Sequence, residues 1–332
     1  MGETNAKYHH LIPRVYMSAW ERGNGTLQVE FLKNRGTIER RNKDNIAGIN
    51  HFYSIKAGMP ICEQCDTDLF FEPLAGYTVE YEGSILRTTM EMREKYSDFK
   101  NWKITRPDGT IVGKKPLRDK IEKVNIPEIE LKWSTKYENL WKTEVKKIEQ
   151  AILQSRTFSI PAFDRDFLMR FYVALDWRSI QSNAQFEEEF DLFKGMLEDC
   201  DIPEEERLHP HLKTGWDEFR HNLLLKIYRD YLNDTGIIYE DARAKLIHTN
   251  FHFLISDGPT LFCTSDNPAF MHTRDDGQQV GLLPITPRIL MGNGRCEDEH
   301  DVFYVSHITD EAVQKYNTII AENATEFVII PW

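Results

Sequence analysis

Apolar side chains recur with helical spacing through the middle of the chain, from residue 135 to 245. The helix predicted over 136–154 has an apolar face with the i, i+4, i+7, i+11 spacing of a buried stripe. Glu149 lies at the margin of this stripe, so we expect its carboxylate either in solvent or facing a neighbouring element. The residues of the stripe are Trp141, Val145, Ile148 and Ile152.

A second helix, predicted over 164–181, places an arginine on its apolar face. Arg178 follows Phe171 by seven positions and Ala174 by four, so it lies in the same stripe. An unpaired buried charge is very costly, and the guanidinium must therefore reach water or meet a carboxylate. A structural ion pair and a site that holds an anion both remain open for Arg178. A third helix, over 216–233, has the pattern of plain core.

Both ends of the chain have the alternation and turn residues of β structure. Short β-prone segments such as 26–32 alternate with glycine turns from residue 14 to 57. Strands return at 251–255 and 261–263, followed by one helix and a last strand at 326–330. Neither short β region can bury its own face, so we expect the two ends to pack together. The prediction is an α+β fold with a helical centre.

We expect one integrated domain over residues 1–332, because no linker or repeat interrupts the chain. Residues 58–134 have a mixed pattern with a short helix near 85–95 and a hairpin at 106–112, and they resemble an insertion. The expected parts are a β meander over 1–57, the mixed region over 58–134, the helical core over 135–245, and a C-terminal α/β part over 246–332.

A polar turn follows the predicted strand at 261–263. Proline donates no backbone hydrogen bond, and Asp and Asn bond to their own backbone in turns, so Ser265-Asp266-Asn267-Pro268 ends the strand. Loops held by a rigid strand are common positions for ligand-binding groups. An ordinary Asx-turn and a functional carboxylate at the tip of a loop both remain open for Asp266.

The N-terminal segment contains two histidines, His9 and His10, and His10 stands three residues before Pro13. Histidine can act as a general base or a metal ligand near neutral pH. The proline and the aromatic residues after it, Tyr16 and Trp20, indicate a segment docked on the protein.

These motifs, in this order, resemble domain-of-unknown-function family 4238. That family shows a His-x-x-Pro motif, a glutamate helix, a helix that ends in arginine, a Ser-Asp-x-Pro turn and a closing helix with an asparagine. The resemblance covers both ends and the helical middle, and it matches poorly over 58–134. Met17 and Trp20 stand where the family usually has Leu and Phe. The matching residues are His10, Glu149, Arg178, Asp266 and, in the segment 308–317, Asn317.

The formal net charge of −12 argues against a broad basic surface for long nucleic acid. The first residues lack a signal pattern, and no apolar run approaches the ~18 residues of a membrane span. Five widely spread cysteines fit reduced thiols. We therefore expect a cytoplasmic protein without a membrane partner.

Known cofactor motifs are missing from the sequence. Cys62 and Cys65 form half of a zinc site without a second pair at suitable spacing. The segment Gly109–Lys115 imitates a phosphate loop but is one residue short. The dinucleotide glycine fingerprint is missing too, and we expect no nicotinamide, flavin or haem.

We expect four residues, His10, Glu149, Arg178 and Asp266, to converge within about 10 Å as a catalytic site. Ser265, Asn267 and Asn317 would assist in binding. His10, Glu149 and Asp266 have the ligand types for Mg²⁺, Mn²⁺ or Zn²⁺, and Arg178 would steady an anionic substrate.

This site predicts a metal-dependent hydrolase that acts on a nucleotide or a short nucleic acid. The resemblance to the family, whose members are scattered among bacteria and their mobile elements, suggests a role in conflict or defence. Replacing Asp266 by Ala should then abolish activity and leave the fold intact. The alternatives are a non-catalytic sensor that binds a nucleotide or peptide, and a structural interaction protein with an exposed apolar patch.

Overall fold

The computed structural model describes residues 8–124, 126–155, 157–179, 190–210, 212–296 and 300–332. These residues form two compact units. Unit 1 comprises 51–131 and 190–229, and unit 2 comprises 8–50, 132–189 and 230–332. The single domain over 1–332 and its four expected parts stay predictions.

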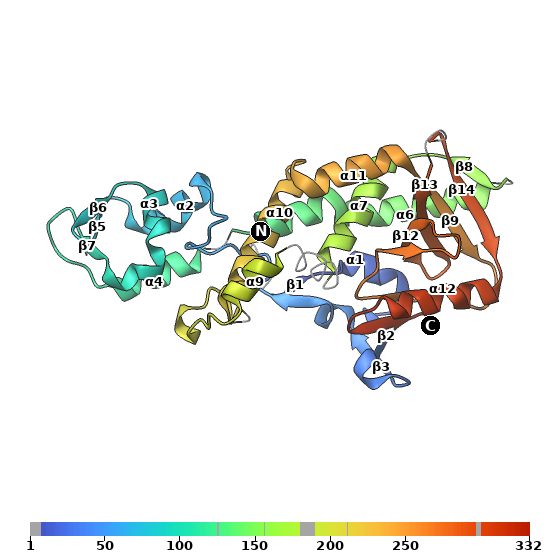
Figure 1. Ribbon diagram of the computed structural model, residues 1–332, viewed down its shortest axis with the longest axis horizontal. Coiled ribbons are helices and arrows are strands. Elements are labelled where there is room, and N and C mark those ends of the chain that lie inside the picture. The colour runs from blue at the N-terminus through green and yellow to red at the C-terminus, as the bar shows by residue number, and fades with distance from the viewer. Residues whose placement is uncertain (1–7, 125, 156, 180–189, 211, 297–299) are drawn as a thin grey trace. The chain divides into compact units, whose positions relative to one another are not determined.

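The larger sheet of unit 2 has the strand order β11-β12-β13-β9-β14-β8 (Figure 1). Its neighbouring strands are antiparallel except for β9 and β14, which run parallel. Helix α7 packs on this sheet, where the Tyr172 hydroxyl donates to the Phe270 carbonyl at 3.1 Å. The strands are β8 (Ser159–Pro161), β9 (Thr249–Ser256), β11 (Phe270–Thr273), β12 (Gln279–Thr286), β13 (Ile289–Arg295) and β14 (Val302–Ile308).

A second sheet joins the two ends of the chain. Its order is β10-β15-β2-β3, and all its neighbours are antiparallel. Val29 of β2 lies opposite Ile329 of β15, and both side chains are fully buried. The predicted packing of the terminal β elements is therefore confirmed, as is the α+β class. The strands are β2 (Thr26–Phe31), β3 (Ile38–Asn42), β10 (Thr264–Ser265) and β15 (Phe327–Ile330), and β1 (Tyr8–His10) pairs separately with β4 (Gly48–Asn50).

The predicted strand at 261–263 is wrong, because the strand begins only at Thr264. The backbone amides of this segment form their hydrogen bonds outside any β-ladder. The Phe262 amide donates to the Pro287 carbonyl, and the Cys263 amide donates to the side chain of Asn317 at 2.9 Å. Apolar residues here fill the core in an irregular conformation.

The helices of unit 2 follow the predicted apolar stripes closely. Trp141 of α6 and Phe171 of α7 stack with ring centroids 3.9 Å apart, and both are almost fully buried. A π-helical turn, Ser134–Glu138, precedes α6. The helices are α1 (Arg14–Met17), α6 (Asn139–Gln154), α7 (Arg165–Arg178), α11 (Gly236–His248) and α12 (Asp310–Glu322), with 3₁₀ turns at Ser18–Trp20, Leu32–Asn34 and Lys43–Asn45.

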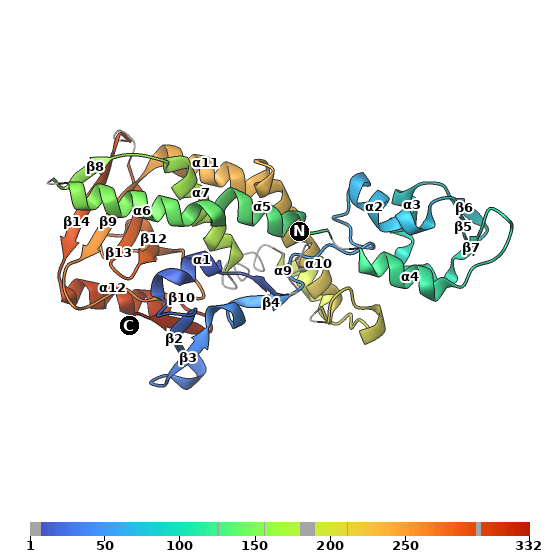
Figure 2. The same cartoon turned by 180° about the vertical axis from the view of Figure 1, so that it is seen from behind.

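A hydrophobic core connects the two sheets of unit 2 to α12. Leu282 and Leu290 from the larger sheet share this core with Ile320 of α12 and Val328 of β15. Helix α12 lies beside the second sheet in both views (Figures 1 and 2). The core also contains Phe262 and Cys263, so it holds the C-terminal strand and the segment before β10 in place.

Unit 1 is built of short helices and a small sheet with the order β6-β5-β7. Its interior contains a bidentate ion pair, in which the Arg229 guanidinium donates to both carboxylate oxygens of Asp66 at 2.7 and 3.1 Å. The predicted hairpin at 106–112 is confirmed, because the Gly109 amide donates a hydrogen bond to the Arg106 carbonyl and closes the turn. The elements are α2 (Gln64–Phe71), β5 (Thr78–Tyr81), β6 (Ser84–Leu86), α3 (Thr89–Glu94), β7 (Lys103–Thr105), α4 (Lys114–Lys123) and α9 (Asp191–Leu197), with 3₁₀ turns at Glu72–Leu74, Tyr96–Asn101 and Glu204–Glu206. Two helices contribute residues to both units, α5 (Glu128–Trp133) and α10 (Gly215–Leu232).

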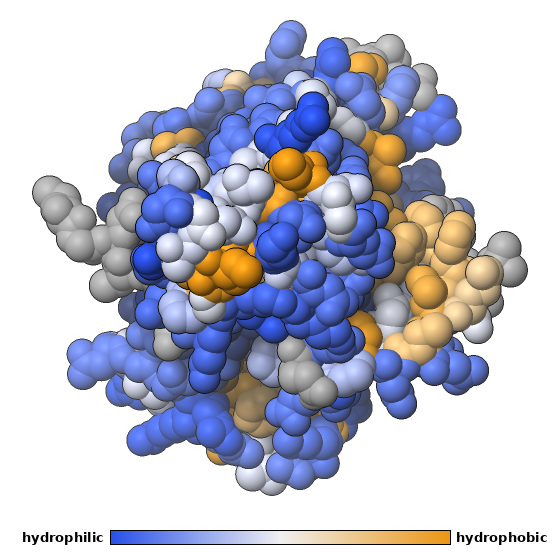
Figure 3. Space-filling model, turned by 90° about the vertical axis from the view of Figure 1, so that its left-hand side faces the viewer, coloured by the Kyte–Doolittle hydropathy of each residue, from blue (hydrophilic) through white to orange (hydrophobic). Residues whose placement is uncertain are grey.

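The surface drawn in Figure 3 is mainly hydrophilic, with one broader apolar patch at the right of the view and smaller apolar patches elsewhere. Within the described ranges, no helix is both long enough and apolar enough to span a membrane. The thiols of all five cysteines are free. Burial raises the pKa of the Cys62 thiol to about 12, so this thiol is protonated at neutral pH.

Candidate functional site

Arg178 ends helix α7 with 2% of its side-chain surface exposed. Its Nη1 donates to Oε1 of Glu138 at 3.0 Å, and its Nη2 donates to the carbonyl oxygen of His10 at 2.5 Å. The guanidinium also lies 4.8 Å from the ring centroid of Trp133. The acidic partner of Arg178 is therefore Glu138, at the end of the π-helical turn, and the structure brings Arg178 and His10 into contact.

His10 lies half-buried in β1. Its Nε2 is 3.2 Å from the carbonyl oxygen of Lys43, which can only accept, so Nε2 carries a proton. Burial and then the charge of Arg14 lower the pKa of His10. The imidazole is consequently neutral near pH 7, with its lone pair on Nδ1.

Glu149 is half-buried on α6, and its side chain forms no hydrogen bond or ion pair with another described residue. Glu138, eleven positions earlier, pairs with the arginine instead. The proposed roles of Glu149 as catalytic residue and metal ligand stay predictions.

Asp266 is buried, with 5% of its surface exposed, and is therefore not at an exposed loop tip. Its Oδ1 accepts from the Thr325 amide at 3.0 Å, and its Oδ2 accepts from the Glu326 amide at 2.6 Å. Burial, opposed by these bonds, raises the pKa of the carboxyl. Asp266 thus ties the turn after β10 to the start of β15, and its replacement by Ala is expected to cost stability.

The neighbours of Asp266 in the turn bond to the backbone. The Ser265 hydroxyl donates to the Asn267 carbonyl at 3.0 Å, and the Asn267 side chain donates to the carbonyl of Asn323, which caps α12. Asn317 bonds through its side chain to the amide of Cys263 and the carbonyl of Leu261. These bonds position the turn, and a binding role for Ser265, Asn267 and Asn317 stays a prediction.

A metal site requires several ligands around one point. Across the residues that the structure describes, no three His, Cys, Asp or Glu side chains form a group that could hold a metal ion. The ligand set of His10, Glu149 and Asp266 and the divalent cation both stay predictions.

Asp266 lines a pocket of about 370 Å³ in unit 2, which we call the Asp266 pocket. Its walls combine the N-terminal strand pair with the C-terminal strand, so the two ends of the chain build it together. Apolar side chains form most of the wall, a composition typical of small-ligand sites. The apolar and aromatic members are Tyr8, Leu11, Ile12, Phe31, Ile46, Ile49 and Phe327.

Two carboxylates, those of Asp266 and Glu326, are among the polar groups that line the Asp266 pocket. Glu326 lies at its rim, and its charge raises the pKa values of both Asp266 and Tyr8. Neither carboxylate forms an ion pair with another described residue. Arg41 also lines the pocket, but it pairs with Glu39 of the same strand.

Tyr8 is held rigidly in the pocket wall. Its hydroxyl oxygen accepts from the Gly48 amide at 3.1 Å, so its own hydrogen is left to donate. A Cβ at Gly48 would lie 2.6 Å from the His9 carbonyl oxygen and 2.7 Å from the Tyr8 ring, so only glycine fits there.

Sequence reasoning missed Tyr8, Glu326 and Glu138. Glu326 is the first residue of the predicted last strand and Tyr8 precedes the two histidines, but no motif distinguishes either from a surface residue. Glu138 does have a signal, because it falls on the apolar side of the helix predicted over 136–154.

The fold is α+β, and the Asp266 pocket is largely apolar with two carboxylates in its lining. Residues 8–330 match the model of the DUF4238 family, described as a protein of unknown function. The chain belongs to this family, as the sequence motifs predict. No curated protein and no solved structure matches the chain.

Proposed function

We propose that this chain is a non-catalytic peptide sensor, and that its Asp266 pocket holds the ammonium group of a peptide N-terminus. The supporting observation is the carboxylate of Asp266, which is buried without a cationic partner among the described residues. A buried carboxylate is most stable beside an opposite charge.

An ammonium group matches the polar groups of the pocket. It has three donors and no acceptor, and the pocket offers the oxygens of Asp266 and Glu326. The aromatic rings of Phe31 and Phe327, with centroids 5.8 Å apart, lie in the wall beside them. The first side chain of the peptide would occupy this apolar part, as in other sites that capture a terminal amine.

The test is a calorimetric titration of the full chain with the tripeptide amide Leu-Gly-Gly and with its N-acetylated form. N-acetylation removes the charge and two of the three N–H donors and adds a small acetyl group, and we expect it to weaken binding at least ~10-fold. Asp266→Asn and Glu326→Gln should each weaken binding of the free peptide and leave the acetylated peptide unchanged. Glu322→Gln, on the exposed side of α12, is the matched control.

Two results would reject the proposal. One is equal affinity for the free and acetylated peptides, and the other is unchanged affinity in the Glu326→Gln protein. The second variant is decisive if Asp266→Asn fails to fold, because Glu326 lies at the exposed rim.

The predicted hydrolase is tested in the same preparations. Oligonucleotides and mononucleotides are incubated with Mg²⁺, Mn²⁺ or Zn²⁺ and the products are separated by chromatography. Turnover by the wild type that is lost in Asp266→Asn would favour the hydrolase over the sensor.

A cytoplasmic location is part of the proposal, supported by the free thiols of all five cysteines. The role in conflict or defence and the alternative of a structural interaction protein stay predictions.

A further inference from the structure

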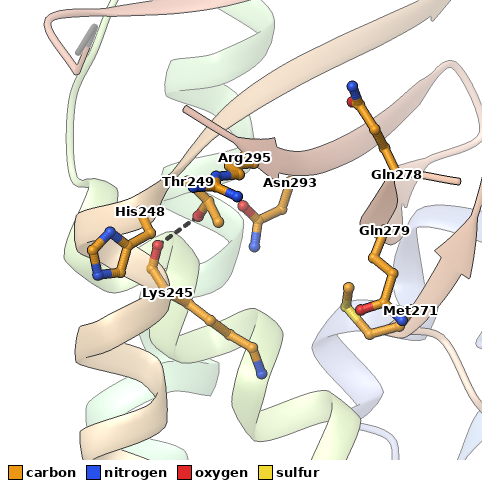
Figure 4. A pocket seen from close by; sticks show the side chains of 8 residues that line it. All are labelled: Lys245, His248, Thr249, Met271, Gln278, Gln279, Asn293 and Arg295. Carbon is orange, nitrogen blue, oxygen red and sulfur yellow. Dashed lines mark hydrogen bonds between the residues drawn. The ribbon is translucent and has the colours of Figure 1, made fainter. Parts of the chain in front are cut away.

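A second pocket of unit 2, of about 820 Å³, lies where helix α11 meets strand β13. We call it the Asn293 pocket. Asn293 projects from β13 between Lys245 on one side and Met271 and Gln279 on the other (Figure 4). This size is within the usual range of small-molecule sites, about 300–1,000 Å³.

Asn293 presents a buried oxygen that has no hydrogen-bond partner in the described part of the chain. The residue is 5% exposed, and its Nδ2 makes only a weak contact of 3.6 Å with the sulfur of Met169. An unsatisfied buried polar group costs about 1–3 kcal/mol. The Oδ1 atom therefore indicates a ligand that supplies an N–H or O–H donor.

The neighbouring strand β12 has a glycine beside Asn293. Asn293 pairs with Gly281 of β12 and Phe251 of β9, and its own strand neighbours are Gly292 and Gly294. Glycine inside a strand often marks a close approach of another group. Gly281, directly opposite on β12 and on the same face as Asn293, has no side chain, so β12 places no side chain beside the asparagine.

The described lining of the Asn293 pocket is cationic, although the whole chain has a net charge of −12. Lys245 and Arg295 contribute positive charges, and no carboxylate is among the described lining residues. Lys245 bonds to Asp241 at 2.5 Å, which uses one of its three N–H donors. His248 also lines the pocket, but its ring points away from Asn293 (Figure 4).

The C-terminus of a helix normally disfavours anions, and α11 ends at this pocket. Arg165 offsets that effect, because its Nη2 donates to the carbonyl oxygens of Leu246 and Thr249 at 2.8 and 2.9 Å. The Thr249 hydroxyl donates to the Lys245 carbonyl at 2.6 Å (Figure 4). The last carbonyls of the helix are therefore satisfied, and a third cation lies behind them.

We infer that the Asn293 pocket binds a nucleoside monophosphate, with its phosphate at Lys245 and Arg295 and a donor of its sugar or base at Asn293. The phosphate is the anion that such cations recognise. Met271 and Gln279 offer an apolar and an amide contact to the rest of the ligand. This site uses none of the residues of the Asp266 pocket.

The test compares four probes by calorimetry with the full chain: AMP, adenosine, ribose 5-phosphate and inorganic phosphate. We expect AMP to bind at least ~10-fold more tightly than adenosine or inorganic phosphate. Lys245→Gln should lower the affinity for AMP and for ribose 5-phosphate and leave the affinity for adenosine unchanged. Lys315→Gln removes an exposed lysine of the same unit and is the matched control.

Asn293 is tested separately from the charges. Asn293→Leu removes the oxygen at similar volume, and Asn293→Ala repeats the test if leucine disturbs folding. Each substitution should lower the affinity for AMP ~10-fold and leave the affinity for inorganic phosphate unchanged. AMP affinity that is unchanged in both asparagine variants, or no binding of any probe, would overturn the inference.

Discussion

Arg178 connects α7 to the π-helical turn and to the first strand through one guanidinium. Replacing it by Met keeps the length of the side chain but leaves the Glu138 carboxylate and the His10 carbonyl without their donor. We expect the free energy of unfolding to fall by about 3 kcal/mol, measured by urea denaturation. Glu138→Gln, at a position with 24% exposure, should cost about 1 kcal/mol because the amide oxygen still accepts. A methionine variant as stable as the wild type would contradict the buried pair.

Protonation of Asp266 makes the free energy of unfolding depend on pH. Burial raises its pKa in the folded protein above the ordinary value of 3.8. The folded state then binds more protons than the unfolded state between the two pKa values, so stability falls as pH rises through this window. Relative to Asp266→Asn, the wild type should lose stability from about pH 4 upward, measured by urea unfolding at several pH values. A constant difference between the two proteins would contradict the raised pKa.

From the sequence, a single residue could be assigned to one face of a helix but not to a particular interaction partner. Periodicity placed Arg178 in a buried stripe and required an acidic partner for it, and the structure contains one. It could not choose between Glu138 and Glu149, because both lie on the same side of a regular helix. The π-helical turn of Ser134–Glu138 has no sequence signal, and the partner of Arg178 lies in it.

Gly281 allows α7 to approach the larger sheet. A Cβ at this position would lie 2.5 Å from the Tyr172 hydroxyl, and Tyr172 is fully buried. Gly281→Ala should therefore lower the free energy of unfolding by about 1–3 kcal/mol. Combining it with Tyr172→Phe removes the clashing oxygen, and we expect the double variant to lose less than the sum of the two single losses. Strictly additive losses in chemical denaturation would show that the two groups do not meet.

At the level of elements, helices were easier to predict than strands. The helices over 139–154 and 165–178 begin and end within a few residues of the predicted bounds, because their stripes repeat over several turns. The segment 261–263 has only three apolar residues, too few to distinguish a strand from an irregular core segment. Its hydrogen bonds depend on Asn317, far along the chain, and local pattern does not contain that information.

For the whole molecule, the pairing of β2 with β15 makes the two ends one cooperative structure. Ile329→Ala removes a fully buried side chain and should cost about 2–5 kcal/mol, with loss of hydrogen-exchange protection in β2 as well as β15. Ile38→Ala is the matched control on β3, where the isoleucine is 55% exposed, and its effect should be within about 0.5 kcal/mol. Loss of protection confined to β15 would show that the two strands open independently.

The class of the fold could be predicted from the sequence, because helical and β patterns occupy separate regions and short terminal strands must find partners. The division into two units could not, since unit 1 combines 51–131 with 190–229 and no linker marks either boundary. Pockets were also beyond prediction, as each gathers residues from several distant segments.

The strand order of the second sheet has a consequence for biosynthesis. The ribosome makes β2 and β3 long before β15, which emerges only after all the residues between them. Until then the hairpin of β2 and β3 has an unpaired edge, and the buried face around Val29 is without its cover. The nascent chain is thus open to wrong pairing with other chains throughout translation, and refolding should give lower yields as protein concentration rises.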